Sequence, residues 1–147
     1  MNIYIAASYS RRLEMQGYAA ELKALGHDVT SRWLSGSHDG LDDGTDSVEA
    51  CARWAREDIE DICAANAMLC FTEPEGVKHG RMRGGRHIEF GIAIALNIAI
   101  RIDAARRPKR LIVVGPRENV FYCLSKLEVF ETWAECMAAL STAVVNV

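Results

Sequence analysis

The sequence predicts a single α/β domain: a doubly wound, mostly parallel five-stranded sheet with helices on both faces. Two observations lead to this fold class. Short apolar runs alternate with longer segments of helical periodicity, and this βαβα order is typical of a parallel sheet covered by helices. The chain has 147 residues, half of them apolar and a quarter charged, which suits one globular domain spanning residues 1–147.

The first half of the chain accounts for three of the predicted strands. Residues 2–8 form a short apolar run rich in Ile and Tyr, and the helical spacing that follows stops at Gly26. A polar loop, residues 35–46, separates the second strand from the next helix. The predicted elements are strands at 2–8, 27–34 and 67–72 and helices at 11–25 and 47–66.

The second half supplies strands at residues 110–115 and 127–130 and a C-terminal helix. Thr132 opens that helix, with Glu135 three residues later in the capping-box position. Segment 88–102 has two interpretations, because apolar residues at every second position fit a strand and rows four residues apart fit a helix. Its length exceeds that of a typical strand, so we favour a helix, apolar nearly all round and therefore buried or at a subunit interface.

Composition and motifs argue against several classes of protein. A net charge of -3 argues against a general nucleic-acid binder, and the most apolar segment, residues 90–100, is too short and too closely bracketed by charges for a membrane span. The N-terminus lacks the features of a signal peptide. Five cysteines without a CxxC pair and four histidines without metal-site spacing indicate a reduced, cytoplasmic protein without a structural metal. GxGxxG and P-loop motifs are absent from the sequence.

Glu89 is the first candidate catalytic residue. Parallel sheets bind ligands outside the carboxyl ends of their strands, where residues 8–12, 73–89 and 115–121 and the loop starting at Ser35 should meet. Glu89 then lies near the N-terminus of a helix that faces the cleft, where the helix dipole favours an anion. A carboxylate set into the apolar run GGRHIEFGIAIAL is costly unless it is paired or used.

A helical wheel of residues 47–66 gives the second candidate, Asp58. The apolar stripe is formed by Val48, Cys51, Ala52, Ala55, Ile59 and Ile62. Asp58 lies at the border of this stripe, whereas Glu57 and Glu60 face arginines four residues earlier and Asp61 lies farther out. Asp58 is therefore the acid expected to face inward, and the other three are expected on a solvated face.

Basic residues are densest in a second predicted loop, residues 73–84, and just after it: Lys78, His79, Arg81, Arg83, Arg86 and His87. A solubilising loop would account for them. Beside a helix N-terminus they could instead hold a phosphate or balance the charge of Glu89.

Four segments together resemble the nucleoside 2-deoxyribosyltransferase family: YIAAS in the first strand, REDIEDI in the helix before the third, GGRHIEFGIAIA, and GPRENVF after the fourth. The resemblance covers nearly the whole chain in the right order. It implies a Rossmann-like or flavodoxin-like sheet, no cofactor, and the transfer of deoxyribose from a deoxynucleoside to a free nucleobase.

The resemblance also implies a role for each matched residue. Glu89, in the pattern Gly-x-x-x-Glu-x-Gly, would be the nucleophile, Tyr4 would position it, and Asp58 would handle the nucleobase. Asn119 would reach from a neighbouring subunit to bind the sugar, which implies a homo-oligomer, a dimer or a multiple of dimers. Tyr9 would stack on the base. Further substrate contacts are expected from Ser8, Arg11, Gly85, Arg86, His87 and Phe121.

Two departures from the family pattern leave other functions open. Members that act on free nucleosides often carry an acid shortly before the nucleophile, where this chain has the basic RMRGGR. This raises the alternative of a deoxynucleoside 5'-monophosphate N-glycosidase, whose substrate brings a phosphate. Segment 97–108 is longer than the usual link, with an expected effect on assembly. A nucleotide-sensing module that does not cleave is the alternative outside enzymes, and an RNA-binding basic loop is a more distant one.

Overall fold

A computed structural model describes residues 1–36, 47–73, 84–100 and 107–144 of the chain. The strands and main helices are β1 Asn2–Ala6, α1 Arg12–Ala24, β2 Asp28–Val29, α2 Val48–Ala64, β3 Ala67–Phe71, α3 Gly85–Ile100, β4 Arg110–Val114, β5 Glu128–Phe130 and α4 Trp133–Val144. Three short 3-10 helices are η1 Tyr9–Arg11, η2 Arg32–Ser35 and η3 Val120–Cys123. The alternation of strands and helices follows the predicted order.

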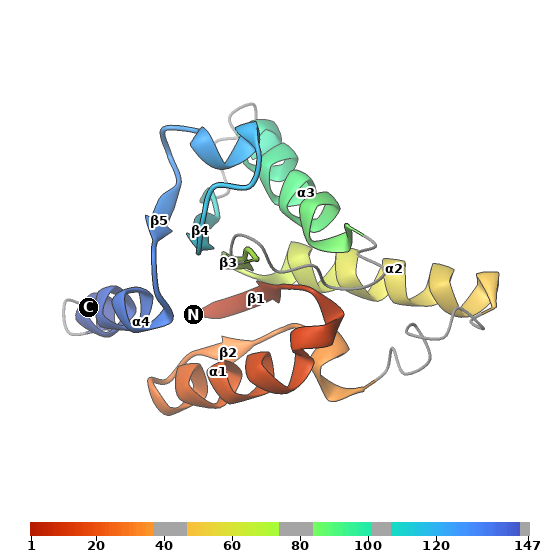
Figure 1. Ribbon diagram of the computed structural model, residues 1–147. Helices are drawn as coiled ribbons and strands as arrows, with labels where there is room; N and C mark the ends of the chain where they lie inside the picture. Colours follow the sequence, from red (N-terminus) through yellow and green to blue (C-terminus); the bar gives the residue numbers. More distant parts are fainter. Residues whose placement is uncertain (37–46, 74–83, 101–106, 145–147) are drawn as a thin grey trace.

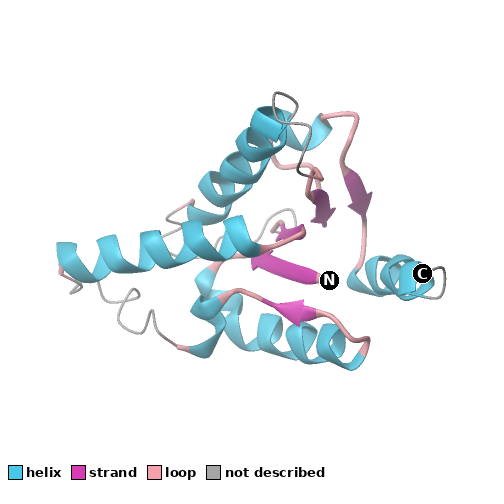
Figure 2. Ribbon diagram, turned by 180° about the vertical axis from the view of Figure 1, so that it is seen from behind, coloured by secondary structure: helices cyan, strands magenta, loops and turns pink. Residues whose placement is uncertain are grey.

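The five strands form one parallel sheet in the order β2-β1-β3-β4-β5. Figure 1 shows α1 and α4 on one face of this sheet and α2 and α3 on the other, and the view from behind in Figure 2 agrees. Tyr18 of α1 stacks on Trp133 of α4, with their ring centroids 4.5 Å apart. The predicted doubly wound sheet with helices on both faces is confirmed.

The three central strands form the core. β3 is buried along its whole length, and β1 and β4 are buried beyond their first residue. Strands covered on both faces are expected to be continuous apolar runs, which explains why these were the clearest strands in the sequence. The ends of β3 and β4 approach closely at Gly115, where an added Cβ would lie 2.4 Å from Oγ1 of Thr72, so only glycine fits.

The second predicted strand, residues 27–34, is wrong in most of its length. Only Asp28–Val29 pairs with β1, and η2 follows. Side chains replace the backbone ladder beyond that point: the backbone N–H of Ile5 donates to Oγ of Ser31 at 2.6 Å, and Nε1 of Trp33 donates to the carbonyl of Ile5 at 2.8 Å. The alternating pattern that predicted a strand therefore reflects side chains that bind the edge of β1.

Residues 88–100 are helical, as favoured, and α3 begins three residues earlier, at Gly85. One side of α3 packs on the sheet through Phe90 and Ala93, while Ile88 is 66% exposed in the single chain. The extension beyond Ile100 lies outside the described residues. At the C-terminal helix the predicted capping box is confirmed, because Glu135 accepts from the backbone N–H of Thr132 and donates its own to Oγ1 of Thr132. Among the described helices, none is long and apolar enough to cross a membrane.

Candidate active site

The strand order changes direction between β1 and β3, and this switch point is where a doubly wound sheet opens a crevice for ligands. The helices that follow β2 and β3, α2 and α3, pack against each other on one face and contact β1. Residues from β1, α2 and α3 therefore converge at one place, although they are far apart in the sequence.

Tyr4, Asp58 and Glu89 meet at this place. Tyr4 is fully buried, and its hydroxyl acts on the pKa of both carboxylates as a hydrogen-bond donor would. No hydrogen bond of full geometry has formed, however: the Tyr4 hydroxyl and Oδ1 of Asp58 are buried without a partner among the described residues. Buried polar atoms are rarely left unpaired, so this cluster has the character of a site that a ligand completes.

Burial gives Asp58 an unusual proton affinity. The pKa of its carboxyl is raised to about 6, mainly by desolvation, and the neighbouring charges of Asp61 and Glu57 raise it further. The Tyr4 hydroxyl and the Arg32 guanidinium act in the opposite direction. A carboxyl of this kind can hold a proton and release it close to neutral pH, as a general acid requires.

Glu89 is shifted farther. Desolvation raises the pKa of its carboxyl to about 8, and the negative charge of Asp58 adds to the shift, whereas the Tyr4 hydroxyl and the charge of Arg86 lower it. Its carboxylate folds back over the first turn of α3, since a Cβ built on Gly85 would lie 3.8 Å from Oε1. The two acids therefore differ in environment, and Glu89 holds a proton more tightly than Asp58 does.

The inward face of α2 differs from the wheel drawn on the sequence. Val48 and Ile59 of the predicted apolar stripe are 80% and 45% exposed, whereas Trp54, Asp61 and Ile62 are buried. Asp58 is partly buried, as predicted. The helical wheel did not identify this inward face because two positions on the face, 58 and 61, carry aspartates instead of apolar side chains.

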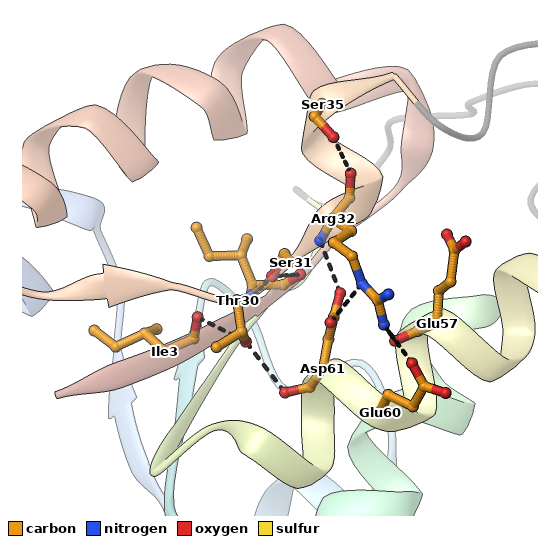
Figure 3. Close-up of polar contacts among 9 residues, drawn as sticks. Ile3, Thr30, Ser31, Arg32, Ser35, Glu57, Glu60 and Asp61 are labelled. Carbon is orange, nitrogen blue, oxygen red and sulfur yellow. Dashed lines mark hydrogen bonds and ion pairs between the residues drawn. The ribbon is translucent and has the colours of Figure 1, made fainter.

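The expectation that Asp61 is solvated is therefore wrong. Asp61 is buried, and its carboxylate accepts from the backbone N–H and from Nε of Arg32, both at 2.8 Å (Figure 3). Arg32 also donates to the carbonyl of Glu57 at 3.0 Å and to the carboxylate of Glu60 at 2.8 Å. This Arg32–Asp61 cluster fastens η2 to α2 one turn away from Asp58.

Two of the predicted basic residues lie in the first turn of α3. Arg86 is 3% exposed, and one of its Nη atoms donates to both carboxylate oxygens of Glu118, at 3.0 and 3.1 Å. His87 bonds through Nδ1 to the hydroxyl of Tyr122 at 2.9 Å. Burial and the charge of Arg86 lower the pKa of His87, and Glu118 opposes them. The remaining predicted basic residues, Lys78, His79, Arg81 and Arg83, lie outside the described residues.

The segment that follows β1 forms η1 at the carboxyl end of that strand. Oγ of Ser8 lies 2.9 Å from Oγ of Ser10. Arg11 donates to both carboxylate oxygens of Glu14 at 2.8 Å and to the carbonyl of Thr72 at 3.0 Å, so its charge is already balanced. The ring of Tyr9 lies 6.2 Å from that of Trp33 between centroids.

Asn119 and Phe121 lie apart from Tyr4, on the outer side of α3. Asn119 accepts from the backbone N–H of Phe121 at 2.9 Å, and its Nδ2 lies 3.3 Å from Nδ1 of His87. Both residues line an apolar groove of about 450 Å³ between η3 and α3. A larger hollow, of about 1010 Å³, lies at the amino ends of the central strands and includes Asn66, Lys109 and Arg110 but no acid among its described lining residues.

Three residues near the site, Glu118, Tyr122 and Arg32, could not be identified from the sequence. Glu118 stands beside Asn119 in GPRENVF, but nothing in the spacing indicates that it meets Arg86, 32 residues earlier. Tyr122 looked like an ordinary core aromatic, and it is buried with its hydroxyl 3.3 Å from Sγ of Cys70. Arg32 lay within a predicted strand.

Comparison with known proteins supports the fold. No family model matches the chain, and no curated protein is similar enough in sequence to be matched. A solved 2-deoxyribosyltransferase from Bacillus psychrosaccharolyticus superposes with a TM-score of 0.63 at 17% identity, covering 93% of this chain and 90% of that one. The CMP N-glycosidase BcmB of Clostridium botulinum superposes with a TM-score of 0.55 at 18% identity, covering 97% of this chain and 99% of that one.

Proposed function

We propose that this chain is a nucleoside 2-deoxyribosyltransferase, which cleaves the N-glycosidic bond of a 2'-deoxynucleoside and transfers the sugar to another nucleobase. The observation that carries the proposal is the convergence of Tyr4, Asp58 and Glu89 at the switch point of the sheet, with buried polar atoms left unpaired. The likeness in fold to a 2-deoxyribosyltransferase and to a CMP N-glycosidase over nearly the whole chain supports it.

In the first half of the reaction, a carboxylate oxygen of Glu89 attacks C1' of the deoxyribose. A C1'–O ester bond forms while the C1'–N bond breaks, and the electron pair of the broken bond leaves with the base. Asp58, in its acid form, gives the departing base a proton. A carboxylate opposite the scissile bond stabilises the oxocarbenium character at C1' and then captures the sugar covalently.

In the second half, a nitrogen of the incoming nucleobase attacks C1' from the side that the first base left. The C1'–O bond breaks, its electrons return to the Glu89 carboxylate, and the Asp58 carboxylate takes the proton of the incoming base. Both acids are then back in their starting states. Two displacements at C1' retain the configuration of the sugar.

This chemistry requires the proton on Asp58 and the charge on Glu89. With pKa values of about 6 and about 8, the pair holds one proton near neutral pH, and Glu89 binds it more tightly than Asp58 does. Positive charge developing at C1' favours the ionised form of Glu89. The Tyr4 hydroxyl, which burial and both carboxylates keep protonated by raising the pKa of Tyr4, can donate a hydrogen bond to whichever acid is ionised.

The substrate contacts follow the position of each residue around this centre. Tyr9 of η1 is proposed to stack on the nucleobase. Gly85 leaves room beside the Glu89 carboxylate for the sugar. Ser8, Arg11, Arg86 and His87 are proposed to contact the 5' end of the substrate. Arg11 and Arg86 are already engaged by Glu14 and Glu118, and this favours an uncharged 5'-hydroxyl at these two residues.

Hydrolysis of a deoxynucleoside 5'-monophosphate is the second candidate. The likeness to a CMP N-glycosidase and the basic run RMRGGR favour it. Water would then replace the incoming base and release free sugar phosphate. A nucleotide-sensing module without turnover is the candidate outside enzymes, and a carboxyl with a pKa of about 8 beside a second acid argues for catalysis over mere binding.

A homo-oligomer is part of the proposal. The groove between η3 and α3 is bordered by large exposed apolar side chains, Ile88, Ile98, Val120 and Phe121. An exposed apolar surface of this kind marks an interface. Asn119 lies at its edge beside His87, from where it is proposed to complete the sugar site of a second copy. Mixing the inactive variants Asn119→Ala and Glu89→Gln should then restore activity, and a mixture that stays inactive would contradict the shared site.

The test of the reaction is a panel of 2'-deoxynucleosides and their 5'-monophosphates, incubated with and without a second free base and followed by chromatography. A new nucleoside carrying the added base establishes transfer. Base release from the monophosphates alone, without exchange, establishes the hydrolase instead. If every substrate stays unaltered, both the transferase and the hydrolase proposals are overturned, and the nucleotide-sensing module is the candidate that is left.

A further inference from the structure

Glu118 connects three segments around Glu89. It lies after β4, binds Arg86 in the first turn of α3, and its Oε1 also accepts from the backbone N–H of Glu73 at 2.7 Å, just after β3. The side chains of Arg86 and Glu118 are 3% and 19% exposed, so water screens this pair little. Glu118 thereby joins the last described residue before segment 74–83 to the start of the helix that carries Glu89.

Arg86 acts on Glu89 without binding it. Its charge lowers the pKa of Glu89, yet neither a hydrogen bond nor an ion pair joins the two side chains in the described structure. Nε of Arg86 is buried and has no hydrogen-bond partner among the described residues, so the guanidinium still has a donor to offer. A buried arginine with a free donor would be drawn to the nearest carboxylate if its own partner were removed.

We propose that Glu118 is a positioning residue for the nucleophile. By binding both of its oxygens to Arg86, Glu118 keeps the guanidinium close enough to favour the ionised form of Glu89 but prevents it from pairing with the carboxylate that must attack C1'. This inference rests on the proposed role of Glu89, and it extends that role to a pair of residues that do not react.

The charged and titratable groups around Glu89 define what the test must separate. They are Tyr4 on β1, Asp58 on α2, Cys70 on β3 and Arg86 on α3. Around Glu118 they are Arg86, His87, Cys70 and Tyr122. Arg86 and Glu118 carry opposite charges, so removing one or the other should move the titration of the acid pair in opposite directions. If Arg86 and Glu118 had only a structural role, removing either one would not shift the titration of the acid pair in opposite directions.

The experiment measures kcat and kcat/KM against pH for Glu118→Gln and Arg86→Gln. Removing the positive charge of Arg86 should move the profile to higher pH. Removing the negative charge of Glu118 should move it to lower pH and reduce kcat by at least about tenfold, because Arg86 then pairs with Glu89. Glu118→Asp, which keeps the charge, should keep the wild-type position of the profile.

Two further variants separate an electrostatic effect on Glu89 from a loss of activity caused by misfolding. The double variant Arg86→Gln, Glu118→Gln removes the pair without leaving a lone buried charge, so it should fold, remain slow, and return the profile to its wild-type position. Glu128→Gln makes the same chemical change in a bidentate pair with Arg110 at the amino ends of β4 and β5, and should leave the profile unmoved. Single variants that shift the profile in the same direction, or not at all, would overturn the proposal.

A measurement without substrate separates this inference from the proposed reaction. The carboxyl carbon of Glu89 is titrated by NMR in the same variants, with Glu89→Gln to assign its signal. An upward shift of its pKa in Arg86→Gln and a downward shift in Glu118→Gln uphold the electrostatic part even for a protein that turns over no nucleoside. An unchanged titration in an active enzyme overturns the role of Glu118 and leaves the reaction intact.

Discussion

Asp58 and Glu89 face one site from neighbouring helices, and each has an arginine that favours its ionised form, but the two arginines differ in exposure. The side chain of Arg32, near Asp58, is 45% exposed and divides its hydrogen bonds between Asp61, Glu60 and a carbonyl. Arg86, near Glu89, is almost fully buried with Glu118. Water and salt screen the first arginine and scarcely affect the second. The pKa of Glu89, the proposed nucleophile, should therefore depend on its arginine more than the pKa of Asp58, the proposed acid, does on its own.

Glu89→Gln should have the largest effect. Without the carboxylate no ester to C1' can form, so kcat should fall by at least about three orders of magnitude while the circular dichroism spectrum stays unchanged.

The same variant should also change the free energy of unfolding, in a direction that depends on pH. The pKa of Glu89 rises from 4.5 to about 8 on folding, so the wild type loses stability as pH rises through this interval. At pH 9 the variant should therefore be more stable, by a few kcal/mol at most. A variant as active as the wild type would contradict the catalytic role of Glu89, and a variant less stable than the wild type at pH 9 would contradict its raised pKa.

Asp58→Asn should come next. Loss of a general acid costs about 10²–10⁴-fold in rate, because the base must then leave without a proton. The loss should be much smaller for a substrate whose leaving group needs no protonation, such as a deoxyribosyl compound with a strongly acidic phenol. Equal losses for both substrates would show that Asp58 does not act as the acid.

The wild-type pH profile follows from the two acids together. The active form carries one proton on the pair, so kcat/KM should peak between about pH 6 and about pH 8. Below this range Glu89 is also protonated, and above it Asp58 has lost the proton that the base requires. Each limb should fall about tenfold per pH unit. A profile that rises steadily beyond pH 9 would contradict the assignment of roles.

Tyr4→Phe should have a moderate effect. Removing the hydroxyl takes away a buried donor that favours the charged forms of both acids, so the pH profile should move to higher pH and kcat should fall roughly tenfold. Because the hydroxyl is buried without a partner, its loss should leave the melting temperature unchanged or raise it. A large drop in melting temperature would assign Tyr4 to packing alone.

Arg32→Gln should have the smallest effect on turnover. Arg32 lowers the pKa of Asp58, so the variant should raise it, but the exposure of Arg32 limits the change in kcat to about threefold or less. The melting temperature should fall, because Asp61 is buried and would lose its partner. Arg56→Gln on α2, the helix that carries Asp58 and Asp61, is the matched control and should alter neither kcat nor the melting temperature. A loss of activity larger than that of Arg86→Gln would reverse the comparison between the two arginines.

The sequence predicts the sheet and its helices well because the signals are local. Buried parallel strands are unbroken apolar runs, and the Thr132–Glu135 capping box marks the start of α4 within four residues. Asp58 and Glu89 could be singled out for the same reason, since each carboxylate lies within or beside an apolar stretch of its own helix, and burial raises the pKa of both. The error at residues 27–34 arose where side chains, not the backbone, satisfy the edge of β1.

The partners of the two acids could not be predicted, because they come from distant segments. Arg32 meets Asp61 across 29 residues, and Arg86 meets Glu118 across 32. Periodicity within one helix cannot show that a buried aspartate such as Asp61 has its counter-charge on another element, so the wheel placed it in solvent. Only the folded sheet brings these pairs together.

The most direct test of the account is to trap the sugar on Glu89. The protein is mixed with a deoxynucleoside in the absence of an acceptor base, quenched rapidly in acid, digested, and examined by mass spectrometry. The account predicts that the peptide containing Glu89 gains the mass of one deoxyribosyl group, that Asp58→Asn reduces its rate of formation, and that Glu89→Gln abolishes it. A peptide that stays unmodified while the base is released, or a sugar found on another residue, would contradict the central claim that Glu89 is the nucleophile.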